Sequence, residues 1–129
     1  MLSRRSPGYT ALVNRVPSPD PTAERVARNN AIFREANEGI SGTARGYGLD
    51  KRVPFICECA DPACTAIIQV ELHEYERIRG NGTWFLDATG HYRSSQGYAD
   101  VIESRDGYDV VEKRGAAGDL AEDLDPRTD

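Results

Sequence analysis

The stretch VPFICECADPACTAIIQVEL, residues 53–72, decides how the rest of the chain is organised. All three cysteines of the protein fall within eight residues of this stretch: Cys57, Cys59 and Cys64. Runs rich in β-branched residues lead into the thiols and out of them, and Asp61-Pro62 predicts a tight turn between them. We therefore expect two antiparallel strands, at residues 53–58 and 67–72, joined by a cysteine-rich turn.

The spacing C-x-C-x4-C lets three thiolates converge on one ion. Thiolates are soft ligands that suit Zn²⁺, which takes four tetrahedral ligands in structural sites. The chain holds two histidines that could complete the set, His73 and His91. His91 follows Gly90 in an expected loop, from which its ring can reach the thiols, whereas His73 is expected to point to solvent. We favour His91, and Asp61 or water remains the alternative fourth ligand.

Other interpretations of the clustered thiols stay open. Cysteine is commonly buried, so the three thiols could be inert core residues. Thiol redox or iron–sulfur chemistry is a further alternative, although the known C-x-C cluster pattern keeps its last Cys and its His close together, and here His91 follows Cys64 by 27 residues. The zinc-deaminase signature is absent. Glu58 could act as a general base at an open metal site, but we favour a surface carboxylate at the strand edge.

Length and charge narrow the class of protein. The 129 residues carry a net charge of −5 and are expected to form one domain. Residues 1–52 hold nine Lys/Arg against five Asp/Glu, whereas residues 53–129 hold seven against sixteen, which opposes general binding of nucleic acid. No stretch approaches the ~20 apolar residues of a membrane span. Residues 1–16 lack the apolar segment of a signal peptide, so we expect a cytoplasmic protein with reduced thiols.

The first third of the chain predicts one helix. Residues 1–19 are expected to be a flexible lead, because Pro and Gly punctuate them. Asp20 followed by Pro21 predicts a helix start, and the helix should run to about Ile40. A narrow apolar stripe recurs along it, formed by Val26, Phe33, Ala36 and Ile40. Packing of this stripe on the domain's own sheet is favoured, and packing on a partner stays open.

Three further elements are expected in order: helical turns at 73–79, a short strand at 83–87, and a hairpin of strands 98–103 and 108–113. Asp106-Gly107 between the last two runs is a strong hairpin signal. Residues 115–129 are expected to be an acidic tail, with a short helix around Leu120 and Leu124 as the alternative. The predicted fold is therefore α+β. Its domain, residues 20–114, combines an N-terminal helix and a small, mostly antiparallel sheet with a Cys3His zinc knuckle.

Five segments of the chain carry a recognisable pattern: AERVARNNAIFREANE, ICECADPACTAII, ELHEYERIRG, WFLDATGH and VIESRDGYDVVEK. This pattern resembles a family of small uncharacterised actinobacterial proteins, over roughly residues 22–126. Members of that family end the fourth segment in Gly-His, so the resemblance favours His91 over His73 and implies a bacterial origin. An acidic residue follows this His in many members, whereas Tyr92 stands here. The family has no assigned activity, so the resemblance leaves function open.

The leading functional hypothesis is a non-enzymatic zinc-binding regulatory module whose partner is another protein, because a closed Cys3His shell leaves no position for a substrate. The first alternative is a nucleic-acid-binding transcriptional regulator that uses Arg25, Arg28, Arg34, Lys51 and Arg52. The second alternative is a zinc enzyme or thiol redox sensor, which requires an open coordination position or an exposed reactive thiol. The identity of the partner and the oligomeric state stay open.

Overall fold

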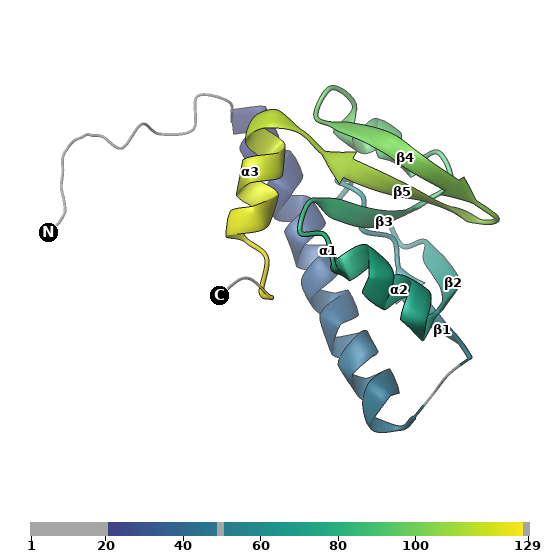
Figure 1. Ribbon diagram of the computed structural model, residues 1–129. Coiled ribbons are helices and arrows are strands. Elements are labelled where there is room, and N and C mark those ends of the chain that lie inside the picture. The colour runs from purple at the N-terminus through teal and green to yellow at the C-terminus, as the bar shows by residue number, and fades with distance from the viewer. Residues whose placement is uncertain (1–20, 49–50, 128–129) are drawn as a thin grey trace, which may run out of the picture.

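The chain folds into three α-helices, one 3-10 helix and five strands within the residues that the structure describes (Figure 1). The structure is a computed structural model and describes residues 21–48 and 51–127. The expected lead, residues 1–19, lies outside this part. The elements in order are α1 (Pro21–Gly46), β1 (Arg52–Ile56), β2 (Ile67–Glu71), α2 (Leu72–Arg79), β3 (Trp84–Ala88), η1 (His91–Ser95), β4 (Ala99–Arg105), β5 (Tyr108–Lys113) and α3 (Gly115–Asp123).

The strands form two small antiparallel sheets. β1 and β2 make a hairpin in which Phe55 lies opposite Ile68. The second sheet has the order β3-β5-β4, and the turn at Gly107, whose φ is 91°, joins its last two strands. Glycine adopts this left-handed conformation without steric cost. The predicted fold class, an N-terminal helix with small antiparallel sheets, is confirmed.

The main apolar core lies where both sheets meet α2 and the C-terminal half of α1. Side chains of β1 and β2 alternate between buried and exposed, as expected for strands with one covered face. Phe55 stacks on Tyr75 with ring centroids 4.2 Å apart. The buried members of this core are Ala44, Val53, Phe55, Cys57, Cys59, Ile68, Val70, Tyr75, Ile78, Leu86, Tyr108 and Val110. Two of the predicted metal ligands thus belong to the core itself.

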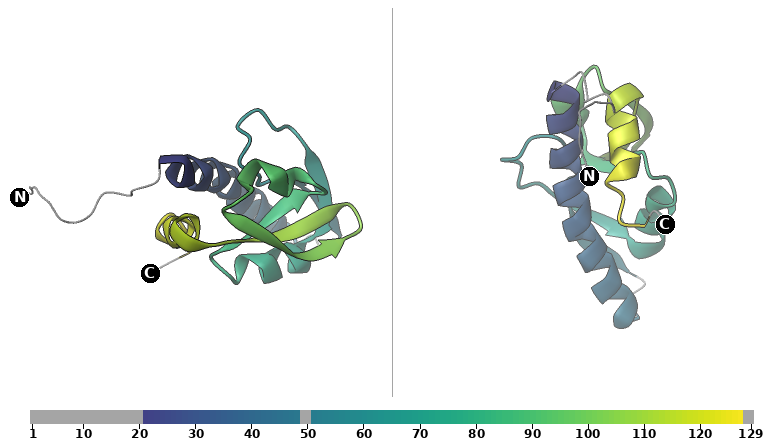
Figure 2. Two further views of the ribbon diagram at one scale, coloured as in Figure 1. Left: turned by 90° about the horizontal axis from the view of Figure 1, so that it is seen from above. Right: turned by 90° about the vertical axis from the view of Figure 1, so that its left-hand side faces the viewer.

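The long helix α1 crosses the whole molecule, and α3 lies alongside its N-terminal half (Figures 1 and 2). α1 ends at Gly46, six residues beyond the expected end at Ile40. Two glycines interrupt this last part of α1, and each costs the helix about 1 kcal/mol relative to alanine. Tertiary contacts offset that cost, because Ala44 is in the core and Ser41 donates a hydrogen bond to Glu76.

The buried face of α1 is largely polar, which corrects the predicted apolar stripe. Val26 is buried and Ile40 packs against the core, but Phe33 is only half-buried and Ala36 is exposed. The buried side chains of α1 are Ala23, Val26, Ala27, Asn30, Arg34, Asn37, Ser41 and Ala44. α1 packs on the chain's own turns, strands and α3, where exposed backbone groups need hydrogen-bond partners.

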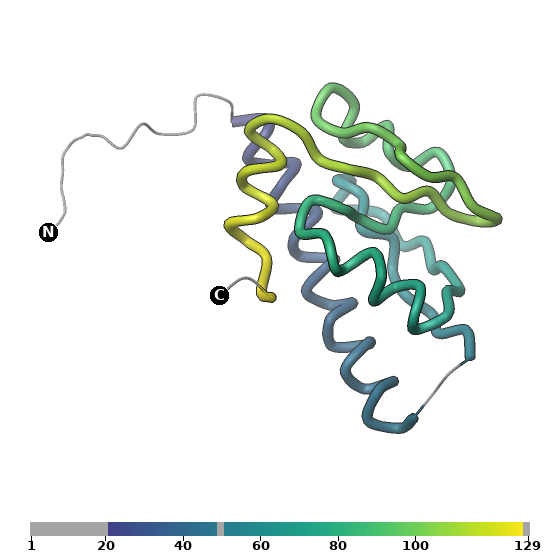
Figure 3. The backbone as a smooth tube through the Cα atoms, in the orientation of Figure 1, coloured from purple at the N-terminus to yellow at the C-terminus, as the bar shows by residue number. Residues whose placement is uncertain are grey.

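The C-terminal segment is part of the packed structure. α3 places Ala117 and Ala121 in contact with the interior, and both are fully buried. Figure 3 shows α3 running beside α1, so the first and last helices of the described chain pack together. The prediction of an acidic tail over residues 115–129 is therefore wrong for residues 115–127. The alternative, a short helix, forms at Gly115–Asp123.

None of the helices formed by the described residues has the length and apolar character needed to cross a membrane.

Candidate metal centre

The cysteines are brought together by the turn between β1 and β2. The hairpin continues one step past β1, where the N–H of Cys57 donates to the carbonyl of Ala66 over 3.0 Å. The chain then reverses, and the N–H of Cys64 donates to the carbonyl of Asp61 over 3.0 Å. The Asp61 carboxylate accepts from the N–H of Ala63 over 2.9 Å, the side-chain turn that Asp favours. This local geometry returns Cys64 to the other two thiols.

His91 reaches the thiols from the loop that follows β3. Gly90 directly before it has φ 83°, a conformation that residues with a side chain rarely adopt. The N–H of Gly90 donates to the carboxylate of Asp109 over 3.1 Å, which ties the loop to β5. His91 then begins η1, and its ring turns toward Cys57 and Cys64.

The four predicted ligands lie together. The Nδ1 atom of His91 lies 3.6 Å from Sγ of Cys57 and 3.4 Å from Sγ of Cys64. One ligand atom from each of the four residues, Cys59 included, lies within 4.8 Å of the others. With Zn–S of about 2.3 Å and Zn–N of about 2.0 Å, an N-to-S edge of a tetrahedron measures about 3.5 Å. The observed distances of 3.4 and 3.6 Å fit that edge, with Nδ1 as the ring nitrogen that faces the thiols.

The other residues considered as fourth ligand contact other groups instead of the thiols. The side chain of His73 is 78% exposed, and its Nε2 lies 3.3 Å from the carboxylate of Glu71. Asp61 is exposed and bonded within its own turn. Of the candidates raised by the sequence, the structure brings only His91 to the cysteines.

Backbone N–H groups point at all three sulfurs. The N–H of Ala88 donates to Sγ of Cys57 over 3.2 Å. The hydrogen bond with Cys57 is the largest cause of the lowered pKa of Cys59, and a backbone hydrogen bond from Asp61 lowers it further. Burial raises the pKa of Cys64, and a backbone hydrogen bond from Ala66 opposes that rise. Such donors stabilise thiolates, the form of cysteine that binds metal.

Asparagines of α1 hold the backbone of the knuckle. Asn29 donates to the carbonyl of Ala60 over 2.9 Å, and Asn30 donates to the carbonyl of Glu58 over 2.6 Å. Asn37 donates to the carbonyl of Ile56 over 2.7 Å. Three alternate carbonyls of the cysteine-bearing segment, at residues 56, 58 and 60, thus find partners on one helix. No local pattern in the sequence distinguishes these asparagines from surface residues.

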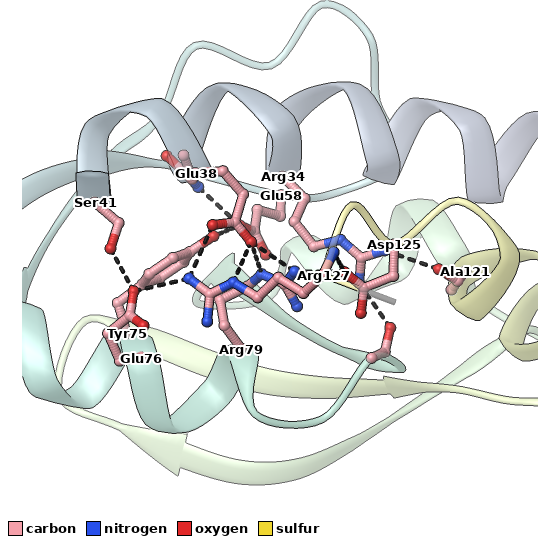
Figure 4. Close-up of polar contacts among 12 residues, drawn as sticks. Arg34, Glu38, Ser41, Glu58, Tyr75, Glu76, Arg79, Ala121, Asp125 and Arg127 are labelled. Atoms are coloured by element: carbon pink, nitrogen blue, oxygen red, sulfur yellow. Dashed lines mark hydrogen bonds and ion pairs between the residues drawn. The ribbon is translucent and has the colours of Figure 1, made fainter. Parts of the chain in front are cut away.

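Glu58, between the first two cysteines, is fully buried, so its expected position on the surface is wrong. Its carboxylate accepts from the hydroxyl of Tyr75 over 2.6 Å and from the side chain of Asn37 over 2.9 Å. The N–H of Leu86 adds a third donor at 2.9 Å. Figure 4 shows this carboxylate between α1 and α2. Burial raises the pKa of Glu58 despite these donors.

A wider charge network continues from this point toward the C-terminus (Figure 4). The buried guanidinium of Arg79 lies 2.6 Å from carboxylates of both Glu38 and Asp125. Arg34 is also buried and donates to the carbonyls of Gly82 and Ala121, over 2.6 and 2.8 Å. No local sequence pattern predicts this network, because hydrogen-bonded partners in it lie up to 87 positions apart.

The basic residues named for nucleic-acid binding do not form one surface. Arg34 is buried. Arg28 pairs with Glu24 near the N-terminal end of α1, whereas Lys51 and Arg52 follow its C-terminal end. The helix between Arg28 and Gly46 spans about 27 Å at 1.5 Å per residue. The structure therefore separates this set into two groups.

A scan against protein-family models, a search of curated proteins and a search of solved structures each found no match.

Proposed function

We propose that Cys57, Cys59, Cys64 and His91 hold a structural Zn²⁺ ion in a cytoplasmic, non-enzymatic module that acts through contacts with another protein. We also propose that the chain is related to the small actinobacterial proteins that its sequence resembles. The observation that carries the metal site is the position of His91, whose Nδ1 lies 3.4 and 3.6 Å from two thiols although 27 and 34 positions separate them in sequence.

The chemistry of the donor set supports zinc. Thiolates favour Zn²⁺ over Mg²⁺ or Ca²⁺, and three thiolates with one imidazole make a complete tetrahedral shell. A complete shell leaves no position for a water to be activated, which supports a structural role. Bound zinc contributes roughly 10–16 kcal/mol to the folding of small zinc-finger peptides, so an ion here would stabilise a domain of this size strongly.

The placement of the ligands supports a stapling role. Cys57, Cys59 and Cys64 lie in the turn of the β1–β2 hairpin, whereas His91 follows β3 of the other sheet. An ion held by all four would join the two sheets at one point. The two carboxylates closest in sequence to the cysteines support this role as well, because both are engaged by other groups. Glu58 is buried among three donors, and Asp61 is bonded within its turn.

Metal analysis of protein purified without added metal tests the proposal. The wild type and His73→Ala should each carry one zinc per chain, and His91→Ala should lose it or bind it at least about 10-fold more weakly in competition with a chelator. The His73 variant is the matched control, because its ring is exposed. Full retention in His91→Ala, or a wild type free of metal, would contradict the assignment.

The protein-partner part of the proposal is tested against the nucleic-acid alternative. The zinc-loaded protein should not bind DNA or RNA at about 50 mM salt, where phosphate contacts are strongest. Binding that weakens steeply with salt would redirect the function to nucleic acid.

A further inference from the structure

Two side chains of opposite charge are buried beneath the three-stranded sheet without a protein partner. Asp87 is fully buried and Lys113 is 2% exposed. Among the described residues, no group forms a hydrogen bond with either carboxylate oxygen of Asp87 or with Nζ of Lys113. Burying such groups unpaired costs several kcal/mol each, so this arrangement requires a further partner.

The two side chains approach each other along one face of the sheet. Lys113 ends β5 at a position one step beyond the pair of Trp84 with Glu112. From there its Nζ reaches back over the ring of Phe85, 4.6 Å from the ring centroid. Asp87 is the next residue of β3 on the same face, about 6.6 Å further along the strand. The amine and the carboxyl form no hydrogen bond with each other, so the two groups share this face of the sheet without a direct contact.

Other polar atoms without a partner border the same region. Asn30 donates to the carbonyl of Glu58, whose N–H in turn donates to the carbonyl of Leu86, the residue before Asp87. The side-chain oxygen of Asn30 has no donor, and the buried hydroxyl of Ser95 in η1 has no partner among the described residues. η1 packs against β3. Unpartnered polar atoms thus also occur on α1 and on η1, two elements that lie next to the segments around Asp87.

The ring of Phe85 closes the other side of this region. The guanidinium of Arg34 lies 4.3 Å from the ring centroid, so Arg34 and Lys113 both rest on the same aromatic side chain. Arg34 is held by two backbone carbonyls and is not free to turn toward Asp87. Arg34 is therefore already engaged by other groups.

We propose that Asp87 and Lys113 bind internal water, which bridges the carboxyl to the amine. Water both donates and accepts, and buried waters typically make about three hydrogen bonds to polar groups that lack protein partners. The bridge satisfies the pair in either protonation state, and burial raises the pKa of Asp87 to about 7. The site does not require the metal ion.

A crystal structure of the wild-type protein at about 1.5 Å resolution tests the proposal directly. An ordered water should lie within about 3.2 Å of both a carboxylate oxygen of Asp87 and Nζ of Lys113. A direct contact between the two side chains would overturn the proposal, as would a region that contains no water. An intact mass lower by one water molecule would also overturn it, because it would show an amide bond between them.

Variants supply an independent readout. Lys113→Met and Asp87→Leu should each lower the folding equilibrium constant by more than about 10-fold, and the double variant should recover most of that loss. The exposed pair Asp100 and Arg114, whose side chains lie 2.6 Å apart, is the matched control and should show less than about 5-fold coupling. Additive losses at Asp87 and Lys113 would overturn the shared site. Asp87→Asn keeps an acceptor of the same size and should keep the crystallographic water if the larger changes do not fold.

Discussion

Asn37 and Ile56 exchange two hydrogen bonds, one of 2.7 Å from the side-chain amide to the carbonyl and one of 2.9 Å from the N–H to the side-chain oxygen. This is the pattern that a neighbouring strand would supply at the open edge of β1. The same amide nitrogen donates to the carboxylate of Glu58 over 2.9 Å. One side chain of α1 thus completes the sheet edge directly before Cys57, the first candidate metal ligand, and satisfies the buried acid directly after it.

Asn37→Asp should therefore destabilise the protein far more than its small change in shape suggests. The new carboxylate cannot donate, so the carbonyl of Ile56 loses its partner and the carboxylate of Glu58 faces a second negative charge. We expect the free energy of unfolding to fall by about 3 kcal/mol or more, measured by denaturant unfolding with zinc present. Asn81→Asp, in an exposed turn, should stay within about 0.5 kcal/mol, and a wild-type value for Asn37→Asp would refute this account.

Asp125→Asn should show that the residues after α3 belong to the domain. The guanidinium of Arg79 is completely buried between Asp125 and Glu38, and removal of one carboxylate leaves part of its charge uncompensated. We expect a loss of about 3 kcal/mol in the free energy of unfolding, because breaking a buried pair is costly. The exposed Asp123, two positions earlier, provides the control, and equal stability of the Asn variants at both positions would contradict the prediction.

The elements with a strong local signal were predictable from the sequence. Alternating apolar residues and Asp106-Gly107 identify the hairpins, and the cysteine spacing with the loop at Gly90-His91 identifies the group that the structure brings together. These signals depend on neighbours in sequence. They are therefore visible in a single chain without any knowledge of distant partners.

The polar interior was not predictable, for a physical reason. The apolar stripe expected on α1 assumed that a helix buries hydrocarbon, yet this helix covers backbone carbonyls and carboxylates that need donors. Arg34 is buried because Gly82 and Ala121 present carbonyls to it, and Glu58 is buried because donors from three other elements converge on it. α3 was uncertain for the same reason, since its contacts are with a helix at the other end of the chain.

Two glycine-to-alanine substitutions should have opposite effects on stability. Gly39 lies in α1 with nothing within 4 Å of the added Cβ, so Gly39→Ala should raise the free energy of unfolding by about 0.5–1 kcal/mol. Gly118 lies in α3 against β5, where a Cβ would be 2.9 Å from the carbonyl oxygen of Lys113. Gly118→Ala should lower the free energy of unfolding by about 1 kcal/mol or more, because the backbone must move. Thermal unfolding of the two variants checks both signs, and stabilisation by both would contradict the close approach of α3.

Ser94→Ala should weaken zinc binding although Ser94 is not a ligand. Its hydroxyl accepts from the N–H of Ala60 over 2.8 Å and donates to the carbonyl of His91 over 2.9 Å, so it joins the cysteine turn to η1. Loss of such an outer contact typically costs 10- to 100-fold in metal affinity, and we expect about 10-fold here. Chelator competition measures the change, with the exposed Ser104→Ala as control. An unchanged affinity would show that the ligands hold their positions without this bridge.

The pH dependence of stability should reveal the state of Asp87. Burial raises its pKa from an ordinary value of 3.8 to about 7. Between these values the native state holds a proton that the unfolded chain has released, so the carboxyl destabilises the fold progressively as pH rises through this window. Asp87→Asn does not titrate at this position and leaves the four candidate metal ligands intact. The difference in unfolding free energy, wild type minus Asp87→Asn, should therefore fall as pH rises from about 4 to about 7 and stay constant above about 8.

Denaturant unfolding of both proteins across this range measures that difference, which removes the pH dependence that the two proteins have in common. A difference that rises with pH would mean that the pKa of Asp87 is below its ordinary value, as expected for a direct ion pair with Lys113. The sign of the slope therefore distinguishes a carboxyl whose pKa is raised by burial from one whose pKa is lowered by close contact with the amine of Lys113.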